Sequence, residues 1–319
     1  MEGDIMSRVF ITGSSDGLGR MAAQLLIEQG HSVVLHARNE ERGREAMSAV
    51  PGAETVVTGD LTSIAQTRNV AEQVNALGSF DAVVHNAGIG YREPRRIATE
   101  DGLPHVFAVN TLAPYILTAL IRRPKRLVYL SSGLHRSGDA SLKDLLWEHR
   151  PWDGQQAYSD TKLHDVLLAF AVARLWPDVL SNALEPGWVP TKMGGPGAPD
   201  DIDAAHRTQV WLAVSTIRMQ PSRGNTSTTC GFGRRIPRPM TKNCRRDCSL
   251  IATVFREWIC PLPEIARAIH NHSQIVGDTE VESQSRTRCR HDCRPIGERF
   301  CDSRIEAKYW GVETEKLTI

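Results

Sequence analysis

The strongest constraint on this chain is an alternation, repeated over its first 216 residues, between short apolar runs and segments with helical periodicity. The apolar runs occupy residues 8–12, 31–37, 54–58, 80–85, 126–131 and 180–184. Helical patterns cover residues 18–29, 40–49, 61–77, 103–121, 156–175 and 203–216. Apolar runs joined by helical crossovers predict a parallel sheet with helices on both faces. Because such crossovers are right-handed, the doubly wound arrangement is the expected topology.

A glycine-rich turn follows the first apolar run and opens the first helical segment. Gly13, Gly17 and Gly19 have the spacing of a dinucleotide-binding turn. Glycines allow positive φ and the close approach of a pyrophosphate, which the positive end of the helix attracts. In a strand–helix–strand unit of about 30 residues, this pattern predicts a Rossmann-type nucleotide site; the alternative is an ordinary glycine-rich turn.

The end of the second apolar run bears on which dinucleotide the site takes. No Asp or Glu, which would accept a hydrogen bond from the ribose 2′-hydroxyl of NAD, occurs in residues 31–39, and Arg38 stands there instead. An arginine at this point pairs with the 2′-phosphate of NADP. The sequence therefore predicts NADP, unless Arg38 is only a surface residue at the end of a strand.

Tyr158 and Lys162 are four residues apart, and therefore lie on one face of the predicted helix. An ammonium beside a phenol favours the phenolate, so such a tyrosine can give a proton to a carbonyl or take one from an alcohol. The pair is also a common accident on helix surfaces. Ser131 and Ser132 end the preceding apolar run, at the sheet edge where ligands bind, and either hydroxyl could reach a reacting oxygen.

In combination these motifs resemble the short-chain dehydrogenase/reductase family, in particular its retinol dehydrogenase-like and carbonyl reductase-like members. The resemblance spans about residues 7–215 and implies an NADP-binding catalytic domain of Rossmann type over residues 1–216. The cofactor-binding residues that it implies are Gly13, Ser15, Gly17, Leu18, Gly19, Arg38, Asp60, Leu61, Asn86, Ala87, Gly88, Tyr158, Lys162, Pro186, Gly187, Val189 and Thr191.

The resemblance also implies roles in catalysis for Asn110, Ser132, Tyr158 and Lys162. Tyr158 would be the acid/base of a hydride transfer between NADP(H) and a carbonyl or alcohol. Lys162 would assist Tyr158 and bind the nicotinamide ribose, Ser132 would steady the substrate oxygen, and Asn110 would hold a relay water. Ser132 is preferred to Ser131 because the long separation from Tyr158 resembles the retinol dehydrogenase-like branch.

The sequence departs from the family pattern at two places. His85 replaces an asparagine often found before Asn86, and its imidazole can still donate one hydrogen bond. Beyond residue 216, no regular periodicity continues where the family has a seventh strand and the far wall of the substrate pocket. The final edge strand is therefore expected to be missing, which would leave the sixth strand uncovered and could impair catalysis.

Residues 217–319 differ in composition from the rest. They hold all seven cysteines, from Cys230 to Cys301, and more Lys and Arg than Asp and Glu. We interpret them as an irregular, disordered basic tail. A zinc module is a weaker alternative because the cysteine spacings are loose, and a nucleic-acid-binding segment is weaker because the runs of Lys and Arg are short. We also hypothesise an out-of-frame translation from near Thr216, because a shifted frame permits a Gly-x-Tyr-Phe strand. Sequencing of the transcript would test this hypothesis.

The composition narrows the remaining function classes. A net charge of +1 gives no reason to expect nucleic acid or an anionic membrane as a partner, and no apolar run is long enough to span a bilayer. We expect a cytoplasmic NADP-dependent oxidoreductase, acting on a small carbonyl or alcohol, that could form homo-oligomers; no metal is expected. The alternatives are a catalytically impaired nucleotide-binding protein and an interaction protein acting through its tail. Trp147, Trp152, Trp188 and Leu134 suggest an apolar substrate or are part of the core.

Overall fold

Each of the six apolar runs contains a strand of one parallel sheet. The computed structural model describes residues 6–215 and 227–228. The strands follow the order β3-β2-β1-β4-β5-β6-β7, so the direction of winding reverses between β1 and β4. Their bounds are β1 Arg8–Ile11, β2 Ser32–Ala37, β3 Thr55–Thr58, β4 Ala82–His85, β5 Arg126–Leu130, β6 Leu180–Glu185 and β7 Ser227–Thr228. The predicted doubly wound Rossmann-type fold is confirmed.

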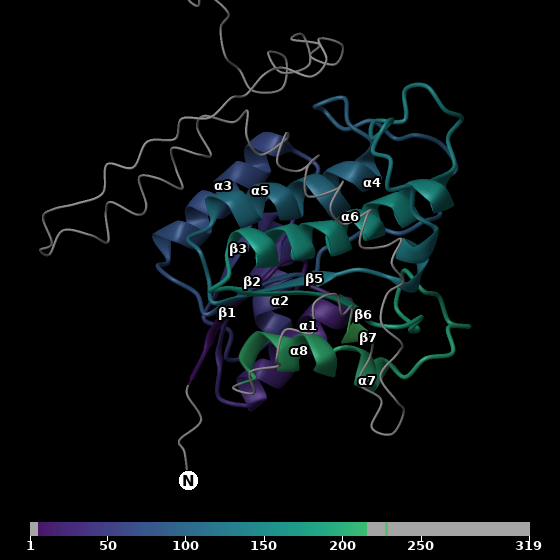
Figure 1. The fold of residues 1–319 in the computed structure, drawn as a ribbon. Helices are drawn as coiled ribbons and strands as arrows, with labels where there is room; N and C mark the ends of the chain where they lie inside the picture. The colour runs from purple at the N-terminus through teal and green to yellow at the C-terminus, as the bar shows by residue number, and fades with distance from the viewer. Residues whose placement is uncertain (1–5, 216–226, 229–319) are drawn as a thin grey trace, which may run out of the picture. The chain divides into compact units, whose positions relative to one another are not determined.

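Helices cover both faces of this sheet (Figure 1). Their bounds are α1 Gly17–Glu28, α2 Glu40–Ala49, α3 Ile64–Ala76, α4 His105–Phe107, α5 Ala113–Leu120, α6 Gly154–Leu175, α7 Ile202–Ala205 and α8 Arg207–Val214. One buried apolar cluster joins the sheet to α3, α5 and α6, and a second joins it to α1, α2 and α8. The central strands β1, β2, β4 and β5 are buried on both faces, which is why they read as continuous apolar runs, whereas β3 and β6 are largely half-buried.

Two predicted helices are interrupted. The helix expected over residues 103–121 consists of α4, a π-helical turn η1 at Ala108–Leu112, and α5. Pro114 stands in the first turn of α5. Because proline has no N–H, it cannot donate to the carbonyl four residues earlier, and the helix is π-helical rather than α-helical just before it. The helix expected over residues 203–216 is divided at His206 into α7 and α8.

The edge of the sheet differs in part from the expectation that a final strand is missing. A two-residue strand, β7, pairs in parallel with the end of β6, opposite Leu184 and Glu185. It leaves the first four residues of β6 without a partner on that side among the described residues. The irregular tail, its cysteines and the hypothesised frame change otherwise lie outside the described residues. Within the described part, no helix is both long and apolar enough to cross a membrane.

Three of the five buried histidines among the described residues lie on β2, β4 and α6, and burial lowers the pKa of His36 to about 4, of His85 to about 3 and of His164 to about 4. They stay neutral in the fold but take up protons in the unfolded chain below pH 6.5. The free energy of unfolding should therefore fall as the pH drops from 6.5 towards 4, by about 2 kcal/mol per histidine at pH 5.

Urea unfolding from pH 7 to pH 5 measures this slope, and the His85→Asn variant, which loses one titrating group, should show a shallower one. Asp165, whose pKa burial raises to about 6, acts in the opposite direction over the same range and reduces the total. Equal slopes for the two proteins would contradict the assignment to His85.

Candidate functional site

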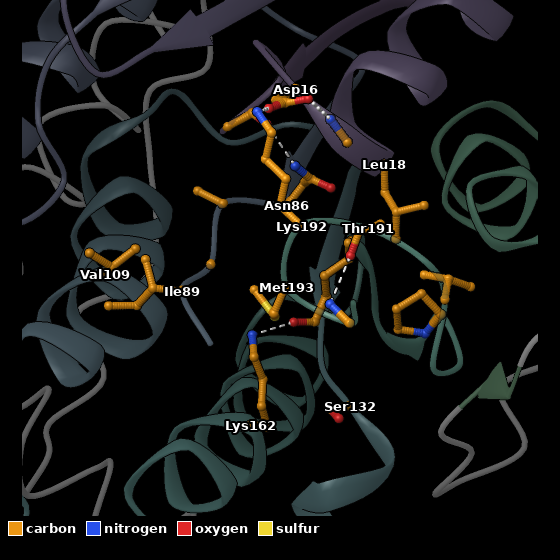
Figure 2. Close-up of a pocket in the computed structure, with 18 of the residues that line it drawn as sticks. Asp16, Leu18, Asn86, Ile89, Val109, Ser132, Lys162, Thr191, Lys192 and Met193 are labelled. Atoms are coloured by element: carbon orange, nitrogen blue, oxygen red, sulfur yellow. Dashed lines mark hydrogen bonds and ion pairs between the residues drawn. The ribbon is translucent and has the colours of Figure 1, made fainter. Parts of the chain in front are cut away.

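A cavity of about 1240 Å³ runs along the carboxyl ends of the strands, where the winding direction changes. The glycine-rich turn, the ends of β4, β5 and β6, and the first turns of α6 all contribute to its wall. Figure 2 shows Asp16, Lys162 and Ser132 around this space. Every residue that the sequence predicts for the site lines the cavity, apart from Gly19 and Asn110, which lie directly behind its wall.

The glycine-rich turn is held so tightly against β4 that side chains are excluded. Gly13 has φ of +61°, and a Cβ on it would lie 2.8 Å from the Cα of Ala87. A Cβ on Gly19 would lie 2.7 Å from the Gly13 carbonyl oxygen and would also collide with the side-chain amide of Asn86. That amide donates to the carbonyls of Thr12 and Gly13, at 2.9 and 3.1 Å. The turn is therefore shaped to let a phosphate approach the backbone at the start of α1.

His36 fixes the same turn from the other side, and sequence reasoning did not single it out. Its Nδ1 accepts a hydrogen bond from the Gly13 N–H at 3.0 Å, so its Nε2 donates to the Gly59 carbonyl at 3.0 Å. The Ser14 hydroxyl accepts from the His36 N–H at 2.9 Å. The sequence does show a polar residue inside an apolar run, but this pattern does not reveal which turn the side chain of His36 contacts.

The outer end of the cavity is basic. Arg38, Arg42 and Lys192 line it, and Arg42 was not predicted. Asp16 caps α1 by accepting from the Gly17 N–H, and it also forms ion pairs with Lys192 and, at 3.8 Å, with Arg42. Its hydrogen bond from Lys192 holds the pKa of the Asp16 carboxyl below its ordinary value. Several positive groups therefore gather near the end of β2. This arrangement suits a ligand that carries a further anionic group in addition to its pyrophosphate.

Tyr158 lies at the inner end of the cavity and is 6% exposed. Asp153 caps α6 and so fixes where the helix begins. The Tyr158 ring packs against Tyr91 with ring centres 5.6 Å apart, and its hydroxyl contacts the Met193 sulfur at 3.8 Å. The Lys162 Nζ lies 5.8 Å from the centre of the Tyr158 ring. The predicted pair therefore shares one side of α6 and faces the cavity.

The ammonium of Lys162 is buried and held by two protein groups. Its Nζ donates to the Leu130 carbonyl at 2.7 Å and to Oδ2 of Asp165 at 2.8 Å. Burial lowers the pKa of Lys162, but the charges of Asp165 and of an ionised Tyr158 outweigh it and leave that pKa above its ordinary value. Asp165 was not predicted, although its i,i+3 spacing from Lys162 was a signal.

The two adjacent serines have different surroundings. The Ser131 hydroxyl donates to the Lys162 carbonyl at 2.7 Å, which ties the end of β5 to α6. Both serines line the cavity, but among the described residues the Ser132 hydroxyl accepts only a long hydrogen bond of 3.3 Å from the Leu134 N–H. This difference supports the choice of Ser132 as the serine that meets a ligand.

Asn110 is fully buried in the π-helical turn η1. Its side-chain amide both accepts from the Ile89 N–H at 2.9 Å and donates to the Ile89 carbonyl at 3.1 Å. It also donates to the Thr161 hydroxyl at 3.1 Å. Because Pro114 has no N–H, the main-chain carbonyl of Asn110 lacks its α-helical donor.

The inner end of the cavity has an apolar wall, formed by Ile89, Val109, Leu134, Trp188 and Met193. Trp188 is 53% exposed, as expected for a residue at the rim. By contrast, Trp147 and Trp152 pack against each other, with ring centres 5.2 Å apart, and do not line the cavity.

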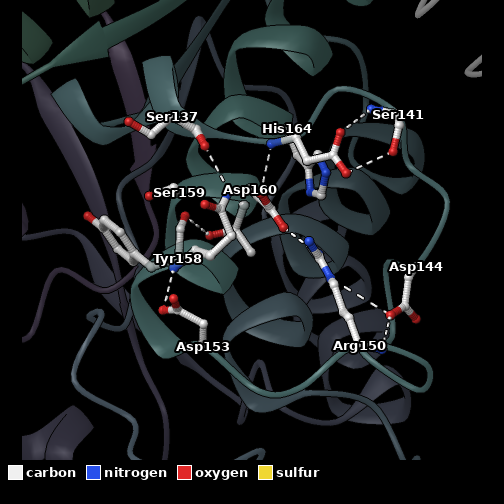
Figure 3. Close-up of polar contacts among 12 residues, drawn as sticks. Ser137, Ser141, Asp144, Arg150, Asp153, Tyr158, Ser159, Asp160 and His164 are labelled. Atoms are coloured by element: carbon white, nitrogen blue, oxygen red, sulfur yellow. Dashed lines mark hydrogen bonds and ion pairs between the residues drawn. The ribbon is translucent and has the colours of Figure 1, made fainter.

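A polar network anchors the segment between β5 and α6 to the far side of α6 (Figure 3). Arg150 pairs with the buried Asp160 at 2.5 Å and lies 3.6 Å above the Trp147 ring. Asp160 also accepts from the Asp139 N–H at 2.8 Å. The side chains of Tyr158 and Asp160 thus leave α6 on different faces, one to the cavity and one to this network.

Comparison with known proteins identifies a family. Residues 7–128 match the model for "short chain dehydrogenase". An uncharacterized oxidoreductase of Emericella nidulans is 54% identical over 212 residues, which are 66% of this chain and 80% of that protein. Human retinol dehydrogenase 13 is 32% identical over 201 residues, which are 58% of this chain and 60% of that protein. A crystal structure from Mycobacterium paratuberculosis superposes with a TM-score of 0.58 at 27% identity, covering 66% of this chain and 77% of the other.

Proposed function

Because this chain belongs to the short-chain dehydrogenase family and is an oxidoreductase, we propose that it interconverts a carbonyl and an alcohol with NADP(H), with Tyr158 as the acid/base. The observation that carries the proposal is the pair formed by Tyr158 and Lys162 on the cavity side of α6. A bound nicotinamide supplies or takes up the hydride. The glycine-rich turn, with Asp60 and Leu61 beyond it, would hold the nucleotide half, and Thr191 and its neighbours the nicotinamide half.

The protein's own groups would manage the proton and the substrate oxygen. Tyr158 would give its phenolic proton to a carbonyl oxygen, or receive one from an alcohol. Lys162 would favour the ionised phenol through its buried positive charge, and the Ser132 hydroxyl would hydrogen-bond the reacting oxygen. The carbonyl of Asn110 would hold the water through which the proton is replaced.

The preference for NADP is proposed to depend on Arg38, with Arg42 beside it. Arg38→Asp removes a positive charge and places a negative one next to the 2′-phosphate, so the Kd for NADPH should rise at least tenfold while the Kd for NADH falls. Fluorescence titration with both dinucleotides measures the two changes. Arg44→Asp, an exposed change of the same charge on α2 outside the cavity, is the matched control. Unchanged NADPH affinity in Arg38→Asp would remove this role.

The substrate is proposed to be an apolar aldehyde, ketone or alcohol, because Ile89, Val109, Leu134 and Met193 surround the inner end of the cavity. A panel of such compounds of increasing chain length, with NADPH or NADP, tests this. NADPH titration on the same preparation separates the proposal from its alternative, a nucleotide-binding protein with impaired catalysis. Binding with turnover supports the enzyme; binding without turnover on any compound supports the alternative.

A further inference from the structure

Lys162 has a negatively charged neighbour that the proposed mechanism does not use. An ammonium has three N–H donors, and two of those on Lys162 go to the Leu130 carbonyl and to Asp165. The Lys162 and Asp165 side chains are only 5% and 3% exposed. One donor is left for the cavity, where a Cβ built on Gly88 would lie 3.6 Å from Nζ. The position of the ammonium is thus set from behind by Asp165 and β5.

The surroundings of Asp165 offer it no second cation among the described residues. The elements packed against α6 are β5, β6, α4, η1 and η2, the last a short helix at Gly133–Ser137. Their titratable groups are Arg126, Tyr129, Glu185, His105, His135 and Arg136. Tyr129 is the one whose pKa responds to Asp165: burial raises it first, and the carboxylate raises it further. His85, stacked on Tyr129 at 4.8 Å, is kept neutral by burial.

The other charged groups on these elements have partners elsewhere. Arg136 pairs with Glu185 at 3.5 Å, and His105 with Glu93 at 2.7 Å. Arg126 donates to the carbonyls of Leu212 and Ser215. The field acting on Tyr158 from this side of α6 is therefore that of the Lys162–Asp165 pair taken together. While Asp165 is ionised, much of the ammonium's charge is offset.

We propose that Asp165 is a positioning residue that fixes the Lys162 ammonium behind Tyr158 and tempers the charge that Tyr158 experiences. This inference rests on the proposed function of that same site. Burial favours the neutral carboxyl, and the pKa of Asp165 is raised to about 6 even beside Lys162. Protonation of Asp165 between pH 7 and pH 5 would leave the full ammonium charge facing the phenol.

Asp165→Asn tests the inference because an amide keeps the size and an acceptor oxygen but removes the charge. With the ammonium no longer offset, the phenolate form of Tyr158 becomes easier to reach. In the direction of alcohol oxidation, the rise of kcat/KM with pH should therefore begin about one pH unit lower than in the wild type. The Kd for NADPH should change less than threefold, because the lysine keeps its place. A merely structural role would lower the rate without moving the profile.

Asp160→Asn is the matched control: it removes another buried carboxylate from α6, on the side away from Lys162. Whatever its effect on the rate, its pH profile should coincide with that of the wild type. If the Asp165→Asn profile also coincides with the wild type, the inference is overturned while the proposed function stands.

A second measurement does not need turnover. In protein with lysine labelled by ¹³C at Cε, the Lys162 signal, identified by its absence in Lys162→Met, should shift with a midpoint near pH 6. Asp165→Asn should abolish that shift. A wild-type signal that does not titrate between pH 5 and pH 7 would overturn the inference. Because this outcome is read from the wild type alone, it holds even if Asp165→Asn does not fold. A wild type that titrates in this way yet turns over no substrate would defeat the proposed function alone.

Discussion

Replacing Tyr158 with phenylalanine should reduce turnover by a factor of about 10² to 10⁴ while leaving NADPH binding nearly unchanged. The phenolic oxygen is the group proposed to exchange a proton with the substrate, and the change deletes that oxygen alone. The protein should fold normally, because among the described residues the hydroxyl contacts only the Met193 sulfur, at 3.8 Å, and the ring keeps its packing against Tyr91. Steady-state kinetics on the best substrate of the panel, with NADPH titration of the same variant, measures both effects.

Tyr115→Phe is the control for this substitution. Tyr115 is a half-buried tyrosine on α5 that packs against the core and does not line the cavity, so its loss of a hydroxyl should leave turnover near the wild-type value. If Tyr158→Phe kept a tenth of the wild-type rate, Tyr158 would not be the acid/base, and another proton donor in the cavity would have to be sought.

Gly19→Ala should have the second large effect, a loss of NADPH affinity of at least 100-fold together with a lower Tm. The new methyl group would lie 2.7 Å from the Gly13 carbonyl oxygen and would collide with the Asn86 amide. Relief requires the turn to separate from β4, which would break the hydrogen bonds from Asn86 and displace the backbone that is proposed to hold the pyrophosphate. Such overpacking costs about 1–3 kcal/mol in stability.

NADPH titration and thermal unfolding measure both effects of Gly19→Ala, and Gly197→Ala is the control. No atom lies within 4 Å of a Cβ at position 197, and its φ is not in the left-handed region, so affinity and Tm should both stay at wild-type values. An unchanged Kd in a folded Gly19→Ala protein would show that this turn is not the nucleotide site, whatever its shape.

The strands and most helices could be predicted because their signals are local. A strand buried on both faces is a continuous apolar run, and a helix repeats every 3.6 residues, so both leave a mark in the sequence. The π-helical turn at Ala108–Leu112 and the break at His206 left no such mark. Pro114 pointed to a disturbance, but a proline in a first helical turn is also compatible with a regular helix that begins there.

The site was predictable to the extent that it depends on short motifs. Tyr158 and Lys162 lie together because four residues make about one helical turn. His36 escaped prediction because its role depends on a partner from another element, the Gly13 turn. Asp165 has its partner Lys162 three residues earlier on the same helix, but spacing alone does not show that both side chains are buried and paired. The choice between the serines likewise needed the contact of Ser131 with α6, which connects positions 31 residues apart.

The strand β5 and the helix α6 are clamped twice, since the Ser131 hydroxyl bonds to the Lys162 carbonyl and the Lys162 ammonium to the Leu130 carbonyl. Both bonds join the two ends of the chain segment between β5 and Lys162, of which Ser132, Gly133 and Leu134 line the cavity, so replacement of the segment beyond Ser132 would leave the side chains at its two ends in register. Divergence of that segment is a route by which descendants of one ancestor could acquire new specificities without rebuilding their chemistry.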